Sequence, residues 1–104
     1  MEISIQPKGL STLMVNIGGR LDLDSAVDFG HQVMDAIDNS VEKVEELILD
    51  FSSVTFISSF GLKVILELYK KMTESGGILK IKDASEDIKK NFSLVGFDKF
   101  LILE

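Results

Sequence analysis

The chain has 104 residues, a formal net charge of −6, no cysteine and a hydrophobic share of 45%. This length suits one domain, and the hydrophobic share is sufficient for a packed core. The lack of cysteine excludes disulfides, thiolate catalysis and cysteine metal sites. With only one arginine, Arg20, the acidic chain offers no basic face for nucleic acid.

The N-terminal residues carry no targeting pattern. Residues 1–11 lack a basic region followed by an apolar core, so the sequence predicts no secretory signal. Its uninterrupted apolar runs are only a few residues long, far short of a membrane span. Together with the lack of cysteine, these features favour a cytoplasmic protein that does not insert into a membrane.

The first part of the chain has the pattern of a β-hairpin. Residues 2–6 and 11–17 alternate between polar and apolar side chains, which is the period of a half-buried strand. Between them, the segment 6–9 (QPKG) has the Pro and Gly positions of a type I turn. We therefore expect two antiparallel strands, with residues 18–22 (GGRLD) breaking the second one.

A first helix is predicted up to about Asn39, with Asp24 or Ser25 as its cap. Its apolar stripe at helical spacing consists of Ala26, Phe29, Val33 and Ile37. The outer side would carry Asp28, His31, Gln32, Asp35 and Asp38. Within a helix, Gly30 costs about 1 kcal/mol relative to alanine, and it would allow a close approach to the sheet.

The middle of the chain reads as a strand, a loop and a long helix. The apolar run 47–49 predicts a central strand covered on both faces. After a loop over 51–58, a helix is expected from about Ser59 to Ser75, where Gly76 and Gly77 stop it. Its buried stripe would be Leu62, Ile65, Leu66, Tyr69 and Met72, opposite a polar stripe of Lys63, Glu67, Lys70, Lys71 and Glu74. Lys63 with Glu67, and Lys70 with Glu74, have the spacing of helical ion pairs.

The remaining residues complete an α/β pattern. Residues 78–82 form a predicted strand, and a third helix is expected from its cap Ser85 to about Leu94. Gly96 ends this helix, and residues 100–103 form a last strand. The order β-β-α-β-α-β-α-β predicts an α/β fold with a mixed sheet, one antiparallel hairpin strand and helical crossovers, in one domain over 1–104.

The sequence holds little that suggests an enzyme. It has neither a GxxxxGK[ST] phosphate loop nor a GxGxxG fingerprint, and the one histidine, His31, falls on a polar helix face. The carboxylates lack the spacings of metal motifs. Asp22 and Asp24 allow a weak cation site, but a cap and a turn explain them better. We therefore predict no enzyme activity, no cofactor and no metal site.

Two adjacent serines stand where the second long helix begins. A hydroxyl there lies beside unpaired backbone N–H groups and the positive end of the helix dipole. Such a serine serves as a helix cap, or it stands at a position that accommodates a phosphoryl group. For Ser58 and Ser59, both interpretations are open from this pattern alone.

The surrounding sequence resembles the STAS domain, and in particular the bacterial anti-sigma factor antagonists. In that family, an apolar strand ending in aspartate leads to Asp-Ser-Ser-Gly-Leu or a close variant, followed by an amphipathic helix. The segment 56–62 (FISSFGL) matches at Phe56, Ser59, Gly61 and Leu62. The segment 19–22 (GRLD) is similar to the family's Gly-x-Leu-Asp, and the order of segments matches over essentially the whole chain.

This resemblance implies a STAS-like domain that acts as an anti-anti-sigma factor. Unphosphorylated, it would bind an anti-sigma factor that is also a serine kinase, and so free a sigma factor. Phosphorylation of Ser59 would block that binding. The partner-binding residues implied by the resemblance are Asp22, Ser58, Phe60, Gly61 and Lys63.

Two positions depart from the family pattern. Ser58 stands where the family usually has aspartate, which removes a charge and adds a competing hydroxyl. Phe60 stands where a small residue is usual, and in this it resembles the scaffold proteins of the stressosome. The alternative is therefore a STAS scaffold, or an accessory subunit of a lipid-transport complex, that does not use the serine. A small phosphoryl- or nucleotide-binding enzyme is a third hypothesis, and the missing loops and bases argue against it.

Overall fold

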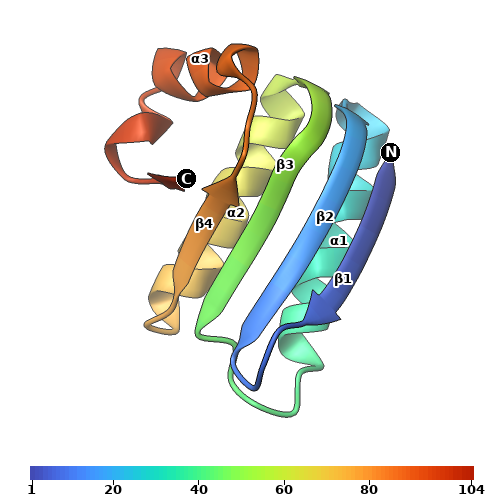
Figure 1. Ribbon diagram of the computed structural model, residues 1–104, viewed down its shortest axis with the longest axis vertical. Helices are drawn as coiled ribbons and strands as arrows, with labels where there is room; N and C mark the ends of the chain where they lie inside the picture. The colour runs from blue at the N-terminus through green and yellow to red at the C-terminus, as the bar shows by residue number, and fades with distance from the viewer.

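The two alternating segments form an antiparallel hairpin at one edge of the sheet (Figure 1). In the computed structural model, which describes all of residues 1–104, β1 (Glu2–Pro7) pairs with β2 (Thr12–Leu21). The turn comes later than predicted, because Pro7 still pairs with Leu13 and the left-handed residue of the turn is Gly9, at φ +83°. The proposed type I turn over 6–9 is therefore wrong.

The other strands follow in sequence order and run parallel to β2. They are β3 (Glu46–Ile57), β4 (Ile78–Lys82) and β5 (Ile102–Leu103), and the sheet order is β1-β2-β3-β4-β5. Since β3 lies between β2 and β4, the apolar side chains of Leu47 and Leu49 are fully buried. The predicted mixed sheet with one antiparallel strand is confirmed, although β5 is shorter than the expected 100–103.

Two predicted interruptions of the sheet are absent. Residues 18–22 do not break β2 after Ile17, because the strand continues to Leu21 through register irregularities around Gly18 and Gly19. The expected loop over 51–58 is also wrong, since β3 extends to Ile57 and pairs with β2 along this stretch. Irregular register disrupts the period-2 alternation on which the prediction of strands depends.

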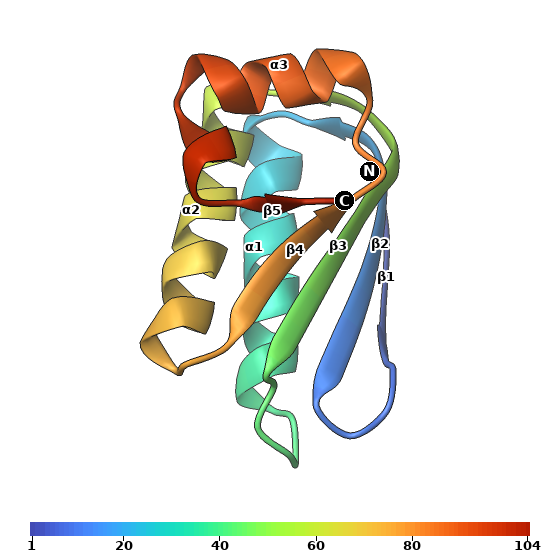
Figure 2. The ribbon, with the colours of Figure 1, turned by 60° about the vertical axis from the view of Figure 1, so that its left-hand side comes forward.

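The two long helices cover one face of the sheet (Figure 2). α1 (Leu23–Asp38) begins earlier than predicted, with Asp22 as its cap in place of Asp24 or Ser25. α2 (Ser59–Glu74) begins at the predicted residue, with Ser58 as cap. Its fully buried residues include Leu68, which was not predicted, whereas Leu62, Leu66 and Tyr69 of the predicted stripe are only partly buried.

The third helix closes the upper end of the sheet (Figures 1 and 2). α3 (Glu86–Leu94) is capped by Ser85 as predicted, and the short 3-10 helix η1 (Phe97–Lys99) follows it. The ring of Phe92 lies 6.2 Å from that of Phe51, so α3 packs on the upper part of β3. The core is one continuous cluster of buried apolar side chains from the sheet and all three helices.

The contact between α1 and α2 differs from the prediction in two respects. A Cβ on Gly30 would lie 3.0 Å from Cγ1 of Val64, so the close approach that Gly30 permits is to α2 and not to the sheet. The predicted i,i+4 ion pairs along α2 are also absent. Instead, the Nζ of Lys71 lies 2.6 Å from Oδ1 of Asp38 on α1.

Candidate functional site

Both long helices begin where β2 and β3 end, at the upper end of the sheet in Figure 1. We call this end of the sheet, with the two helix starts, the edge. The chain passes from β2 into α1 at Asp22 and from β3 into α2 at Ser58. The backbone N–H of Ser58 donates to the carbonyl of Leu21 at 2.9 Å, which ties the two strand ends together. The structure therefore brings Asp22 and Ser58, predicted from separate motifs, to neighbouring helix starts.

The two serines occupy different positions at the start of α2. Ser58 is the half-buried cap, and its Oγ accepts the backbone N–H of Gly61 at 3.2 Å. Ser59 is the first helical residue and is exposed, and its hydroxyl makes no hydrogen bond within the chain. No acidic residue lies in the first turn of α2, so nothing there offsets the positive end of the helix dipole.

Gly61 sets the distance between α2 and the end of β2. A Cβ at this position would lie 2.6 Å from Cγ1 of Ile57 and 3.1 Å from the carbonyl oxygen of Leu21. The missing side chain thus lets α2 start directly against the two strand ends. Beside it, the ring of Phe60 is 48% exposed, which places an apolar group at the edge next to Ser59.

Asp22 closes the first turn of α1 through a capping box. Its Oδ1 accepts the N–H of Ser25 at 3.3 Å and the Ser25 hydroxyl at 2.9 Å, while Asp22 N–H donates to the Oγ of Ser25 at 2.9 Å. The hydrogen bond from the Ser25 hydroxyl holds the pKa of Asp22 below its usual value, with a smaller contribution from the charge of Arg20. Asp22 is therefore ionised at neutral pH and counters the dipole of α1.

One feature of this edge was not predicted as part of the site. The guanidinium of Arg20 lies over the ring of Phe56, with Cζ 4.1 Å from the ring centroid, in the geometry of a cation–π contact. The two residues are partners in the β2–β3 register. Their contact was missed because residues 51–58 were read as a loop, so that Phe56 had no assigned strand partner.

The remaining predicted residue, Lys63, is exposed one turn beyond Ser59 and forms no ion pair. No group of three or more His, Cys, Asp or Glu residues is placed to hold a metal ion. None of the three helices has the length and apolar character needed to cross a membrane. The edge therefore combines an exposed hydroxyl, an exposed aromatic ring and mixed charges, all next to the paired ends of β2 and β3.

Comparison with known proteins gives a family match over nearly the entire chain. The sequence model of the STAS domain matches residues 4–104. The chain is 27% identical over 89 residues to a Paenibacillus polymyxa protein named anti-sigma F factor antagonist, covering 86% of this chain and 74% of that protein. It is also 27% identical over 97 residues to the anti-sigma-B factor antagonist of Bacillus subtilis, covering 92% and 85%.

The fold agrees with solved structures of similar proteins. One is the anti-sigma factor antagonist SpoIIAA in its unphosphorylated form, with a TM-score of 0.79, 16% identity and coverage of 99% of this chain and 87% of that one. The phosphorylated form of the Bacillus SpoIIAA gives a TM-score of 0.77 at 17% identity, covering 99% and 91%. At these identities the likeness supports the fold and not a shared function.

Proposed function

Because the chain belongs to the STAS domain family, we propose that it is an anti-sigma factor antagonist that acts by partner switching. Unphosphorylated, it binds an anti-sigma factor that is also a serine kinase, and a sigma factor is released. Phosphorylation of Ser59 by that partner ends the interaction. The chain is then the substrate of a kinase and not itself an enzyme, and it works in the cytoplasm, where sigma factors act.

The observation that carries this proposal is the difference between the two serines. The Ser58 hydroxyl is engaged as the cap of α2, whereas the Ser59 hydroxyl is exposed and free at the first helical position. A kinase can reach Ser59 without breaking the helix start. The names of the two sequence relatives, and the existence of SpoIIAA in both unphosphorylated and phosphorylated forms, agree with a switch of this kind.

The physical basis of the switch is a local change of charge and bulk. A phosphoserine carries about −1.5 to −2 charge at neutral pH. Within this chain, the uncompensated dipole of α2 tolerates that charge. In an interface formed by Ser58, Phe60 and their neighbours, the phosphate would lose water and displace the partner. A penalty of about 3 kcal/mol lowers affinity roughly a hundredfold, which suffices for a switch without a change of fold.

The test combines site mapping with two substitutions. After incubation with its kinase and ATP, the wild-type chain is expected to carry phosphate on Ser59 by mass spectrometry, and Ser59→Ala is expected to carry none. In calorimetry at moderate salt, Ser59→Ala should bind the anti-sigma factor as well as wild type does. Ser59→Asp should bind about tenfold more weakly if one charge costs about 1.4 kcal/mol. Phosphate confined to Ser58 would show that the assignment is wrong.

The alternative function is a STAS scaffold or accessory subunit that does not use the serine. It is favoured by one observation, the exposed ring of Phe60 at a position where antagonists usually have a small residue. An apolar group there suits a permanent contact better than one that is broken by phosphorylation. This alternative predicts that Ser59→Ala and Ser59→Asp have equal affinities for the anti-sigma factor. The same calorimetric comparison therefore separates the two functions.

A further inference from the structure

The candidate site continues into an apolar seam between α1 and α2. On α1, Leu23 and Val27 stand one turn apart and are 49% and 45% exposed. On α2, Phe60 of the site and Val64 have the same spacing. Side chains four residues apart lie on one face of a helix, so each pair forms a continuous stripe leading away from the start of its helix.

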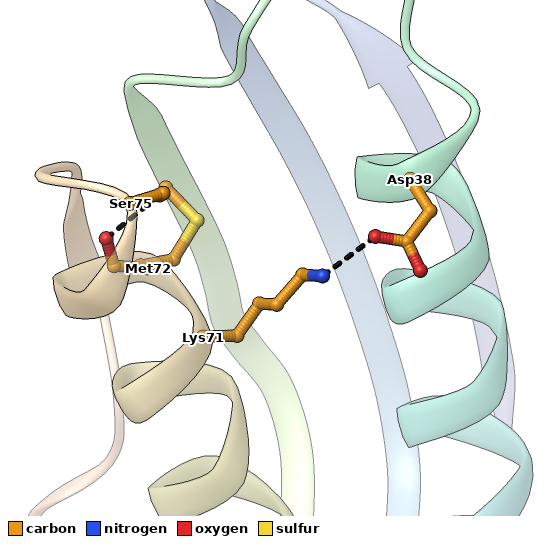
Figure 3. Close-up of polar contacts among 4 residues, drawn as sticks. All are labelled: Asp38, Lys71, Met72 and Ser75. Carbon is orange, nitrogen blue, oxygen red and sulfur yellow. Dashed lines mark hydrogen bonds and ion pairs between the residues drawn. The ribbon is translucent and has the colours of Figure 1, made fainter.

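The seam deepens into a groove of about 150 Å³. Its walls are Val27, Gly30, His31 and Met34 of α1 with Val64 and Glu67 of α2. Gly30 and Val64 are in close contact within this lining, since a Cβ on Gly30 would lie 3.0 Å from Cγ1 of Val64. Beyond it, the Lys71–Asp38 ion pair bridges the two helices near their far ends (Figure 3). The groove thus lies between that ion pair and the edge that carries Ser59.

The charges around this groove are mostly negative. α1 contains four aspartates and no lysine or arginine, and all four, Asp24, Asp28, Asp35 and Asp38, are exposed. Of these, only Asp38 forms an ion pair. On the α2 side, Glu67 adds a further exposed carboxylate that lines the groove, while Lys63 and Lys70 are exposed cations on the same helix, so carboxylates still outnumber free cations. A partner segment that inserts an apolar side chain here would therefore bind best if lysine or arginine residues stood near that side chain in the same segment.

We infer that this groove extends the partner-binding surface, and that it receives an apolar side chain from a basic, amphipathic helix of the anti-sigma factor. The inference rests on the proposed function, because the seam is continuous with the edge at Phe60 and Ser59. A volume of 150 Å³ suits one aliphatic or aromatic side chain and not a drug-sized ligand. Helix-in-groove recognition of this kind uses a few apolar anchors, with charges at the rim setting the orientation.

The test uses two substitutions in the groove, each with a matched control outside it. Val27→Asp places a charge in the groove, and Val41→Asp makes the same change at a fully exposed valine in the α1–β3 loop, 99% exposed. Glu67→Lys inverts a wall charge, and Glu74→Lys makes the same inversion at the last residue of α2, about four turns from Ser59. Each unphosphorylated variant is titrated against the anti-sigma factor kinase of the same genome, after circular dichroism has confirmed its fold.

We expect Val27→Asp to weaken binding by about tenfold or more, as truncation of an interface anchor does, and Val41→Asp to leave it unchanged. Glu67→Lys should slow association and weaken binding by about threefold to tenfold, more at low salt, with little effect of Glu74→Lys.

Equal affinities of Val27→Asp and Val41→Asp would overturn the inference while leaving the proposed function intact. A self-association of the free chain that Val27→Asp abolishes would also overturn it. If the wild-type chain binds no anti-sigma factor at all, the proposed function fails first.

Discussion

The hydroxyl of Ser58 replaces one of the backbone hydrogen bonds that a helix start leaves unmade, since its Oγ accepts the Gly61 N–H at 3.2 Å. The hydroxyl of Ser59, one residue later, makes no such hydrogen bond. An aspartate at position 58, as the family pattern has it, could accept the same hydrogen bond and would add a negative charge at the positive end of α2. The serine in this chain therefore keeps the cap but leaves the dipole uncompensated.

Substitutions at position 58 should separate the cap from the charge. Ser58→Ala is expected to lower the free energy of unfolding by about 1 kcal/mol, because the Gly61 N–H loses its acceptor. Ser58→Asp should be at least as stable as wild type, with up to about 1 kcal/mol gained from the dipole. Urea unfolding measures both, with Ser59→Ala as the control expected to stay near wild type. Equal losses in Ser58→Ala and Ser59→Ala would argue against a specific cap at Ser58.

The position of α2 against the sheet depends on the one glycine in its first turn, Gly61. Gly61 lets the helix begin in contact with the ends of β2 and β3, where the Leu21 carbonyl also accepts the Ser58 N–H. Since Ile57 and Leu21 belong to strands that are hydrogen-bonded to each other, neither can withdraw without disturbing the sheet. The same contact fixes the edge from which Ser59 and Phe60 project.

Gly61→Ala should therefore destabilise the protein even though alanine favours helices. The added Cβ would meet Ile57 at 2.6 Å and the Leu21 carbonyl at 3.1 Å. Overpacking costs about 1–3 kcal/mol, against a gain of about 1 kcal/mol in helix propensity. We expect a net loss in the free energy of unfolding, measured by urea titration, together with weaker binding of the anti-sigma factor. A variant more stable than wild type would show that α2 is not held at this distance.

Prediction from sequence succeeded where a local rule determines the structure. The start of α2 and the extent of α3 follow from serine caps and apolar spacing, and the structure confirms them. The motif that contains Ser59 and Gly61 also located the edge at which the helices start. Prediction failed where pairing between distant segments determines where an element ends. Strand β3 reaches Ile57 only because β2 continues beside it through an irregular register. The Arg20–Phe56 contact depends on this strand pairing, and the groove at Gly30 depends on the packing of α1 against α2. No local sequence pattern reveals either of them.

One charged cluster joins strands β3 and β4 to the last residue of the chain, Glu104. Lys80 of β4 lies 2.7 Å from Oε2 of Glu46 on β3 and 3.4 Å from Oε1 of Glu104. The hydrogen bond from Lys80 holds the pKa of Glu46 below its ordinary value of 4.5, and the hydrogen bond to Glu46 raises the pKa of Lys80 above 10.5. Because the core is one continuous cluster, these contacts affect the unfolding of the domain as a whole.

The lowered pKa of Glu46 determines how stability should change with pH. A carboxylate with a lower pKa in the folded state stabilises that state above its unfolded pKa of about 4.5, and this contribution is lost as the pH falls through the folded pKa. Glu46→Gln should therefore be less stable than wild type at pH 7, and the difference should shrink steadily below about pH 4.5. Glu45→Gln is the matched control, because Glu45 is an exposed neighbour that forms no ion pair. Urea unfolding of the three proteins between neutral and acidic pH measures the difference. A difference in the free energy of unfolding between wild type and Glu46→Gln that stays constant across this range would contradict the prediction. It would mean that the charge of Glu46 does not stabilise the fold, and that the loss of stability at pH 7 comes from packing alone.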